Sequence, residues 1–249
     1  MMTIKTREQI GYMKKAGEIL ASCHKEIARM IRPGITTIEI DQFVEQYLAR
    51  HGATPEQKGY HGYPFATCAS INDVICHGFP KAEPLKEGDI VTIDMVVNLN
   101  GWLADSAWSY EVGQVSDEAR RLLQTTKESL YLGIEKAVVG NRIGDISSAI
   151  QKYAESKGYS VVRDFCGHAI GQQMHEEPQV PHYGPAGRGT RLKEGMVITI
   201  EPMLNIGQHY SYVEEDGWTA RTWDGSLSAQ YEHTIAITSD GPLILTEQK

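Results

Sequence analysis

Five side chains that lie far apart in the sequence could together hold metal ions. Asp94 and Glu201 each end an apolar, strand-like run, and Asp105 follows Asp94 by eleven positions. His168 lies in a glycine-flanked stretch that predicts a loop, and Glu232 begins another apolar strand. The four carboxylates carry four negative charges, which two divalent cations would balance. One imidazole among four carboxylates is an oxygen-rich donor set, which suits Mn²⁺, Fe²⁺ or Co²⁺ better than a closed structural zinc site.

A ten-residue segment that occurs twice contains two of these acids. Residues 85–94 read LKEGDIVTID and residues 192–201 read LKEGMVITIE, with six identical positions. Each copy has a turn-forming glycine and then a β-branched run, which predicts a buried strand ending in a carboxylate. A carboxylate is costly to bury without a partner, so we expect a metal held between two related halves.

The repeat extends upstream of these strands. Four pairs of identical residues are each separated by 106 positions: Gly34 and Gly140, Ile40 and Ile146, Tyr47 and Tyr153, and Gly52 and Gly158. This period is too long for a solenoid unit. We therefore predict one catalytic domain over residues 1–249, duplicated internally as approximately 1–112 and 113–249.

A predicted β-hairpin brings two of the acids together. Two strand-like runs flank Asn100-Gly101, a pair that favours a type I′ turn. With these residues as the turn, Asp105 faces Val96, and Asp94 points to the same face of the hairpin. Diagonal neighbours on one face of a sheet lie about 7–8 Å apart, which is close enough for two carboxylates to share an ion.

Mixed helices and strands predict an α+β fold, in which helices cover one side of a mostly antiparallel sheet. Capping boxes predict helices after Thr6 and Thr36. The second half repeats this order, with helices from about Ser116 and over about 145–158. Residues 53–88 are rich in Gly, Pro and aromatic residues, and we interpret them as irregular.

Composition is that of an ordinary globular protein, with 41% hydrophobic and 22% charged residues among 249. The net charge of −8, without a basic stripe, argues against nucleic acid as a partner. The four cysteines do not suggest a disulfide framework. No apolar run could span a bilayer, and the N-terminal residues do not resemble a signal peptide. We therefore expect a cytoplasmic protein that binds no membrane.

Other catalytic motifs fail at single residues. The stretch from His175 has Gln179 where a helical zinc-protease motif needs its second histidine. The glycine spacing from Gly184 to Gly189 is that of a P-loop, but Thr190 stands where the lysine is required. The sequence contains neither a Gly-x-Ser-x-Gly elbow nor a Rossmann fingerprint.

The most specific stretches resemble the methionine aminopeptidases of the shorter, type I class, and the likeness covers essentially the whole chain. They are Asn72-Asp73-Val74-Ile75-Cys76-His77-Gly78, the Asp94/Asp105 pair, Gly167-His168 through His175-Glu176-Glu177-Pro178, Ile200-Glu201-Pro202 and Gln230-Tyr231-Glu232-His233-Thr234. The resemblance implies a pita-bread fold, in which two pseudo-symmetric α/β halves, with a curved antiparallel sheet covered by helices, enclose a dinuclear metal site.

The resemblance also implies a role for each candidate ligand. Asp94 would chelate one of two divalent ions, Asp105 and Glu232 would bridge both, and His168 and Glu201 would complete the ligands of the other. The ions would be Co, Mn, Fe or Zn. Backbone carbonyls also match a monovalent-cation site of some members, at Asn72, Val74 and Ser228.

The implied reaction is the removal of N-terminal methionine from peptides and nascent proteins whose second residue is small. A metal-activated water would attack the first peptide bond, with His77, His175 and Glu201 as the catalytic residues. His77 and His175 would also contact the substrate. The methionine pocket maps to Tyr60, Tyr63, Cys68, Met174 and Trp218. The implied partners are Met-starting chains and the ribosome, and we expect a monomer.

Four positions depart from the family pattern. Ala169 replaces a glycine after the ligand histidine, and Met174 replaces an aromatic residue of the pocket. Gln57 lies where some members have cysteine, and Val96 stands where a threonine often supports the site. Because Val96 is predicted to face the metals, we expect it to affect amine binding or metal affinity.

Three other functions fit part of the pattern. One is a proline-directed peptidase of the same fold, which is disfavoured because such enzymes usually carry a large N-terminal domain. A metal-free binding module predicts broken ligand positions, whereas all five are intact here. A hydrolase of another small substrate, such as an ester, is disfavoured by the apolar pocket.

Overall fold

The computed structural model of the chain describes residues 3–248. The elements before residue 113 are α1 (Arg7–Met30), α2 (Thr37–Arg50), β1 (Thr54–Pro55), η1 (Tyr60–Gly62), β2 (Cys68–Ile71), β3 (Val74–Cys76), β4 (Ile90–Leu99) and β5 (Trp102–Glu111). The later elements are α3 (Asp117–Ile134), α4 (Ile143–Ser156), β6 (Ser160–Val161), β7 (Gly167–Ala169), β8 (Glu176–Val180), β9 (Val197–Ile200), β10 (Met203–Asn205), β11 (Ser211–Val213), β12 (Ala220–Thr222), β13 (Ser228–Gln230), β14 (His233–Thr238) and β15 (Gly241–Ile244).

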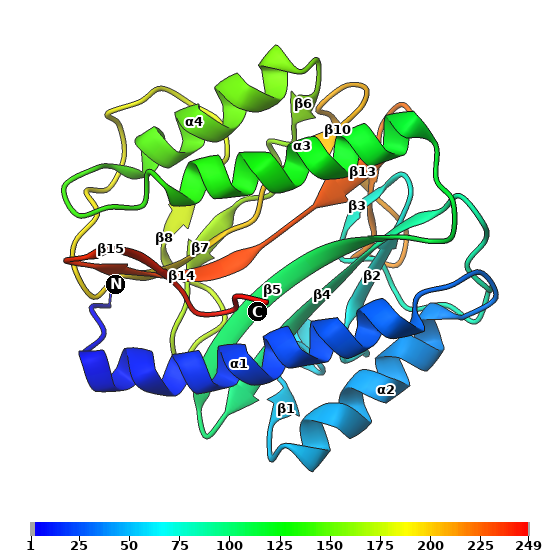
Figure 1. The fold of residues 1–249 in the computed structure, drawn as a ribbon, viewed down its shortest axis with the longest axis horizontal. Coiled ribbons are helices and arrows are strands. Elements are labelled where there is room, and N and C mark those ends of the chain that lie inside the picture. The colour runs from blue at the N-terminus through cyan, green and yellow to red at the C-terminus, as the bar shows by residue number, and fades with distance from the viewer. Residues whose placement is uncertain (1–2, 249) are drawn as a thin grey trace.

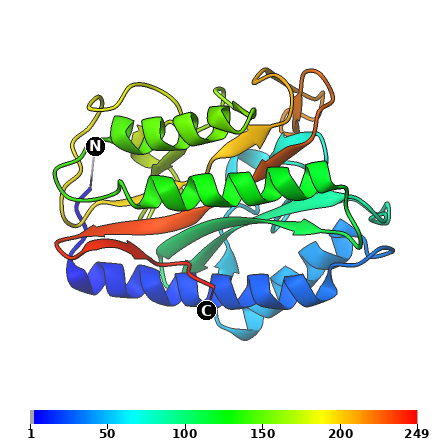
Figure 2. The same ribbon diagram turned by 45° about the horizontal axis from the view of Figure 1, so that its top comes forward.

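The four long helices enclose the strands in two pairs (Figure 1). α1 and α2 lie along one side of the molecule, and α3 and α4 lie along the opposite side, with the sheets between them. In the turned view of Figure 2, β14 and the hairpin of β4 and β5 lie between the blue helix α1 and the green helix α3. The strands form four sheets: β1-β4-β2 with β5 on β4, β13-β10-β6, β11-β12-β3 and β15-β14-β9-β7-β8. All of these pairings are antiparallel, as predicted.

Side-chain caps begin the helices where the sequence predicts them. The hydroxyl of Thr6 caps α1 and that of Thr36 caps α2, each as part of a complete capping box. Ser116 accepts a hydrogen bond from the N–H of Ala119 and so begins α3. α4 begins at Ile143, two residues before the expected start at Asp145.

The predicted hairpin register is confirmed. β4 and β5 pair over their whole length with Leu99 opposite Trp102 and Val96 opposite Asp105. Asn100 and Gly101, the two turn residues, both have positive φ, at 54° and 83°, as a type I′ turn requires.

Two local predictions are wrong. The stretch that we interpreted as irregular contains β2 and β3, and β2 pairs with β4 alongside Asp94. His168 lies on the short strand β7, not in a loop. The strands β2, β3 and β7 are each three or four residues long, which is too short for the alternating pattern that reveals a strand in a sequence.

Each half has its own apolar core, and a third cluster joins the two halves. One core lies between β4 and the helices α1 and α2, and another lies between β9 and the helices α3 and α4. The joining cluster includes Met13 of α1, Val96 of β4 and Val197 of β9. Across residues 3–248, no helix combines the length and apolar character needed to cross a bilayer.

Candidate metal centre

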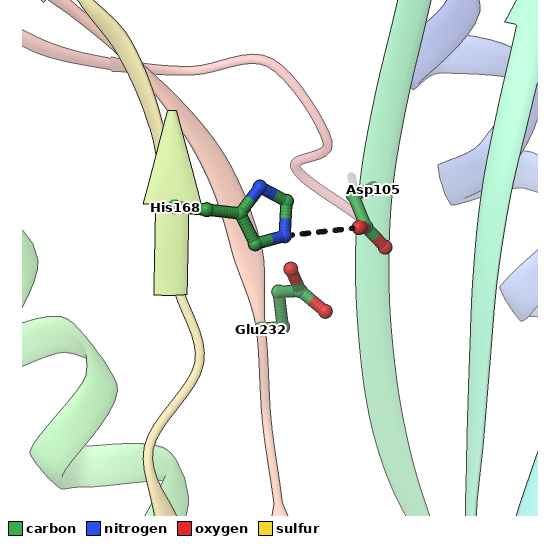
Figure 3. A group of neighbouring side chains, drawn as sticks. All are labelled: Asp105, His168 and Glu232. Carbon is green, nitrogen blue, oxygen red and sulfur yellow. Dashed lines mark ion pairs between the residues drawn. The ribbon is translucent and has the colours of Figure 1, made fainter. Parts of the chain in front are cut away.

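The metal-ligand candidates meet at the junction between the two halves. Asp105 of β5, His168 of β7 and Glu232, which precedes β14, present ligand atoms that all lie within 4.8 Å of one another. Figure 3 shows these three side chains pointing toward a common point from β5, from β7 and from the segment that leads into β14. His168 Nε2 lies 3.7 Å from Asp105 Oδ2 and 3.6 Å from Glu201 Oε1. Asp94 lines the same cavity.

Hydrogen bonds between the halves hold the strands that carry the acids. The N–H of Glu232 donates to the carbonyl of Ala107 at 2.8 Å, and the Ser106 hydroxyl donates to the carbonyl of Glu232 at 2.9 Å. The Thr234 hydroxyl accepts from the N–H of Asp105 at 3.0 Å. The positions of Asp105 and Glu232 are therefore fixed by backbone contacts, independently of any bound ion.

Glu201 is held by its own set of partners. The Thr199 hydroxyl donates to Glu201 Oε1 at 2.8 Å, and the Gln230 side-chain amide donates to Oε2 at 3.3 Å. The N–H of Glu201 donates to His182 Nε2 at 3.1 Å. These bonds orient the carboxylate toward His168 and the cavity.

The burial of four carboxylates around one imidazole shifts the pKa of every group in the site. Burial raises the pKa of Asp94 to about 7 and that of Glu201 to about 8. Burial, followed by repulsion from neighbouring acids, raises the pKa of Asp105 and of Glu232 well above their usual ranges. Burial and then the nearby His175 lower the pKa of His168 to about 3, so its imidazole is neutral and able to coordinate a metal.

The donor set fits divalent metal ions. Within residues 3–248, Asp105 Oδ1 and Glu232 Oε1 are buried acceptors without a hydrogen-bond partner. Buried carboxylates that crowd one another need a cation as partner, and carboxylate oxygens with one imidazole nitrogen are suitable ligands for such an ion.

A cavity of about 270 Å³ opens beside the acids. Its lining includes all five predicted pocket residues and the two predicted substrate histidines: Tyr60, Tyr63, Cys68, His77, Met174, His175 and Trp218. Tyr63 is buried, and its ring packs edge-on against Trp218 at a centroid distance of 5.0 Å. One end of the cavity is therefore aromatic and apolar, and the other end carries the acids.

His175 lies at the cavity mouth between a ligand and a pocket residue. Its ring packs edge-on against His168 at a centroid distance of 4.4 Å, and its Nδ1 lies 2.9 Å from the Tyr60 hydroxyl. Burial, followed by His61, lowers the pKa of His175, and burial with His175 nearby lowers the pKa of His77 to about 4. Both histidines are therefore neutral at pH 7.

Several residues of the cavity carry no signal in the sequence that marks them as functional. Asp164, Phe165, Cys166 and Met203 also line it, and Gln230 holds Glu201 as described above. Phe165 packs edge-on against His77 at 5.5 Å. Neither Asp164 nor Phe165 belongs to a recognisable motif, whereas Gln230 lies in the same stretch as Glu232 and could have been found there.

Two of the three residues of the expected monovalent-cation site, Asn72 and Ser228, are hydrogen-bonded to each other. Asn72 has a positive φ of 55°, and its carbonyl accepts from the N–H of Ser228 at 2.9 Å. Asn205 pairs with Ser228 across β10 and β13. Asn205 Oδ1 and Ser228 Oγ are both buried without a partner among the described residues.

Comparisons with known proteins agree with this geometry. The sequence profile of Metallopeptidase family M24 matches residues 11–239. The chain is 50% identical to the methionine aminopeptidase of Clostridium perfringens and 48% identical to methionine aminopeptidase 1 of Bacillus subtilis, and each alignment covers 99% of both chains.

Two solved structures share the fold of this chain. The crystal structure of methionine aminopeptidase from Rickettsia prowazekii matches with a TM-score of 0.98 and 44% identity over 99% of this chain and 100% of that one. A prolidase from Pyrococcus furiosus matches with a TM-score of 0.81 and 26% identity, over 99% of this chain and 66% of that one. The predicted pita-bread fold is confirmed. The chain belongs to metallopeptidase family M24, among its methionine aminopeptidases.

Proposed function

We propose that this protein removes N-terminal methionine from peptides and nascent proteins whose second residue is small. One observation carries the proposal: a single cavity joins an apolar, aromatic subsite to five converging metal-ligand side chains. The apolar end would hold the methionine side chain. The acid-rich end would hold the free amine and the first peptide bond.

The centre would hold two divalent ions. The side chains that would hold them are Asp94, Asp105, His168, Glu201 and Glu232. The four carboxylates and the unpartnered oxygens of Asp105 and Glu232 support this number. The ions would be Co, Mn, Fe or Zn. When bound, such ions activate water at neutral pH and polarise a carbonyl.

Residues of this chain would perform the remaining steps. Glu201 would accept the proton of the attacking water and pass it to the leaving amine, because its carboxylate is held in the cavity by Thr199 and Gln230, beside His168. His175 would donate a hydrogen bond to the carbonyl oxygen as negative charge develops there. His77, at the cavity wall, would contact the second residue and orient the peptide.

A monovalent cation would bind the carbonyls of Asn72, Val74 and Ser228. The unpartnered oxygens of Asn205 and Ser228 support a buried cation there. Action on nascent chains would place the protein at the ribosome in the cytoplasm, and we expect it to act as a monomer. One catalytic domain, duplicated over about 1–112 and 113–249, would carry the activity.

A peptide panel tests the proposal. Metal-loaded protein should release methionine from Met-Ala-Ser, release it much more slowly from Met-Leu-Ser, and leave Ala-Pro-Ser intact. Cleavage of Ala-Pro-Ser in preference to Met-Ala-Ser would instead favour a proline-directed peptidase, like the prolidase neighbour.

Removal of one ligand tests the centre. D94A should lower kcat/KM on Met-Ala-Ser by at least about 10³-fold and reduce the bound metal, because the carboxylate has no substitute at that position. Full activity with two bound ions would reject the ligand role of Asp94.

A further inference from the structure

Lys5 is a buried lysine that none of the proposed roles uses. Only 6% of the residue is exposed. Lysine is almost never buried this deeply unless its ammonium group is paired. Lys5 belongs to the short segment that leads into α1.

The partner of Lys5 is Glu176, the neighbour of His175 in the chain. Lys5 Nζ lies 2.6 Å from Glu176 Oε2, and the two side chains are 4% and 9% exposed. The Thr3 hydroxyl donates to the same carboxylate oxygen. Burial acts to raise the pKa of Glu176, but the hydrogen bonds from Lys5 and Thr3 outweigh it and leave the pKa below its usual range. Glu176 is therefore ionised, and the contact is a buried ion pair.

This ion pair packs against the loop of residues 171–176 at the edge of the cavity, which we call the mouth loop. A Cβ at Gly171 would lie 2.5 Å from Glu176 Oε1 and 2.6 Å from Lys5 Cε. The loop from Gly171 to Glu176 carries Met174 and His175, which both line the cavity. Glu176 also pairs with Ala169 across β7 and β8, beside a register shift at His168.

The other end of Lys5 is fixed to the body of the protein. Its backbone N–H donates to the carbonyl of Gly195 at 2.7 Å, and the N–H of Gly195 donates to the carbonyl of Ile237 on β14 at 2.9 Å. The backbone of Lys5 is thus fixed to β14 through Gly195, and its ammonium group reaches the mouth loop.

We propose that Lys5 and Glu176 form a positioning pair, which holds the loop of His175 and Met174 in its productive place. A buried ion pair gives less net stability than its geometry suggests, because both charges lose their hydration. Its contribution here is the fixed position of the loop. This inference rests on the proposed peptidase function for its kinetic test, and on the contacts alone for its structural test.

The kinetic test compares three metal-loaded variants with the wild type on Met-Ala-Ser. K5M removes the ammonium group and keeps the side-chain length, and E176Q removes the carboxylate charge. Each should lower kcat by about 10- to 100-fold, because small displacements of a substrate-positioning group have effects of this size, with bound metal unchanged and KM within about threefold. The double variant K5M/E176Q should be no slower than the slower single variant, because both changes break one contact.

R7M is the matched control. Arg7 is two residues away, its side chain is 92% exposed, and it lies 3.8 Å from Glu194, so this variant removes a nearby positive charge without touching the mouth loop. It should keep wild-type kinetics. Wild-type kcat in K5M, at a temperature where the variant is fully folded, would overturn the proposal, and so would multiplicative losses in the double variant.

Hydrogen exchange separates this inference from the proposed function. Amides of residues 171–176 should exchange faster in K5M and E176Q than in the wild type, and R7M should match the wild type. This measurement needs no activity, so a wild-type protein that failed to release methionine would reject the function alone. Unchanged exchange at 171–176 in K5M would reject the positioning pair, whatever the activity.

Discussion

At the scale of single residues, the hydrogen bond between Tyr60 and His175 determines which ring nitrogen of His175 carries the proton. The Tyr60 hydroxyl lies 2.9 Å from Nδ1 of His175. If this hydroxyl donates, Nδ1 is an acceptor and the proton of the neutral ring resides on Nε2. That tautomer is the one in which Nε2 can donate to a developing oxyanion.

Y60F tests this assignment with little change in shape. We expect kcat on Met-Ala-Ser to fall about fivefold to tenfold, which corresponds to roughly 1–1.4 kcal/mol of transition-state stabilisation. Nitrogen-15 NMR of the metal-loaded protein should show a protonated Nε2 on His175 in the wild type and a mixture of tautomers in Y60F. A wild-type spectrum with the proton on Nδ1 would reverse the assignment.

At the scale of elements, the two repeated segments fold into matching turns. Gly88 and Gly195 precede β4 and β9 with φ of 92° and 85°. The N–H of Gly34 donates to the carbonyl of Leu85 at 2.8 Å, and that of Gly140 donates to Leu192 at 3.1 Å. These equivalent bonds support the proposal that the halves arose by duplication.

The same glycine pair provides a matched stability experiment. Both G88A and G195A place a Cβ at a φ that costs roughly 1–3 kcal/mol for a residue other than glycine. A Cβ at Gly88 meets no atom nearer than Gln114 O at 3.8 Å, whereas one at Gly195 would lie 2.6 Å from the carbonyl oxygen of Lys5. Denaturant titration should therefore find G195A less stable than G88A by at least about 1 kcal/mol. Equal losses would show that the Lys5 segment moves away easily.

The sequence predicts the features that neighbouring residues determine, and it contains no pattern for contacts between residues that are far apart in the chain. The register of Asp105 opposite Val96 depends on one two-residue turn, so residues within twelve positions determine it. The capping boxes are equally local. No local pattern encodes the convergence of Asp105 with His168 and Glu232. It is expected from the balance of four carboxylates by two cations, and the family resemblance implies the same ligand set.

The positioning pair of Lys5 and Glu176 had no such signal. The two residues are separated by 171 positions, and each one alone reads as an ordinary charged surface residue. The strands β2 and β3 were missed for a related reason, since their pairing with β4 and β12 stabilises them more than their own composition does.

At the scale of the whole molecule, the centre couples the stability of the fold to pH and to metal. Burial raises the pKa of Asp94 to about 7 and of Glu201 to about 8 in the metal-free protein, whereas both groups titrate near 4 in an unfolded chain. Between these values the folded chain binds more protons than the unfolded chain, so the free energy of unfolding falls as pH rises.

Buried histidines have the opposite effect, in a lower pH range. Burial lowers the pKa of His24 to about 4 and that of His182 to about 3, while an unfolded histidine titrates near 6.5. Their contribution is complete above about pH 6.5 and is lost as pH falls below it. Above pH 6.5 the carboxyls of the centre therefore dominate the pH dependence.

We expect the metal-free protein to become less stable between pH 6.5 and pH 8. Each proton that a carboxyl of the metal centre keeps in the folded chain, but loses in the unfolded chain, lowers the free energy of unfolding by about 1.4 kcal/mol per pH unit. Bound Mn²⁺ should abolish the decline, because the cations replace those protons, and D105N should reduce it in the metal-free protein, because one acid of the cluster is gone. Denaturant titrations at the two pH values, with and without Mn²⁺, measure all three effects. A metal-free protein that grew more stable toward pH 8 would mean that its acids are already ionised and separately solvated, which five converging ligands do not allow.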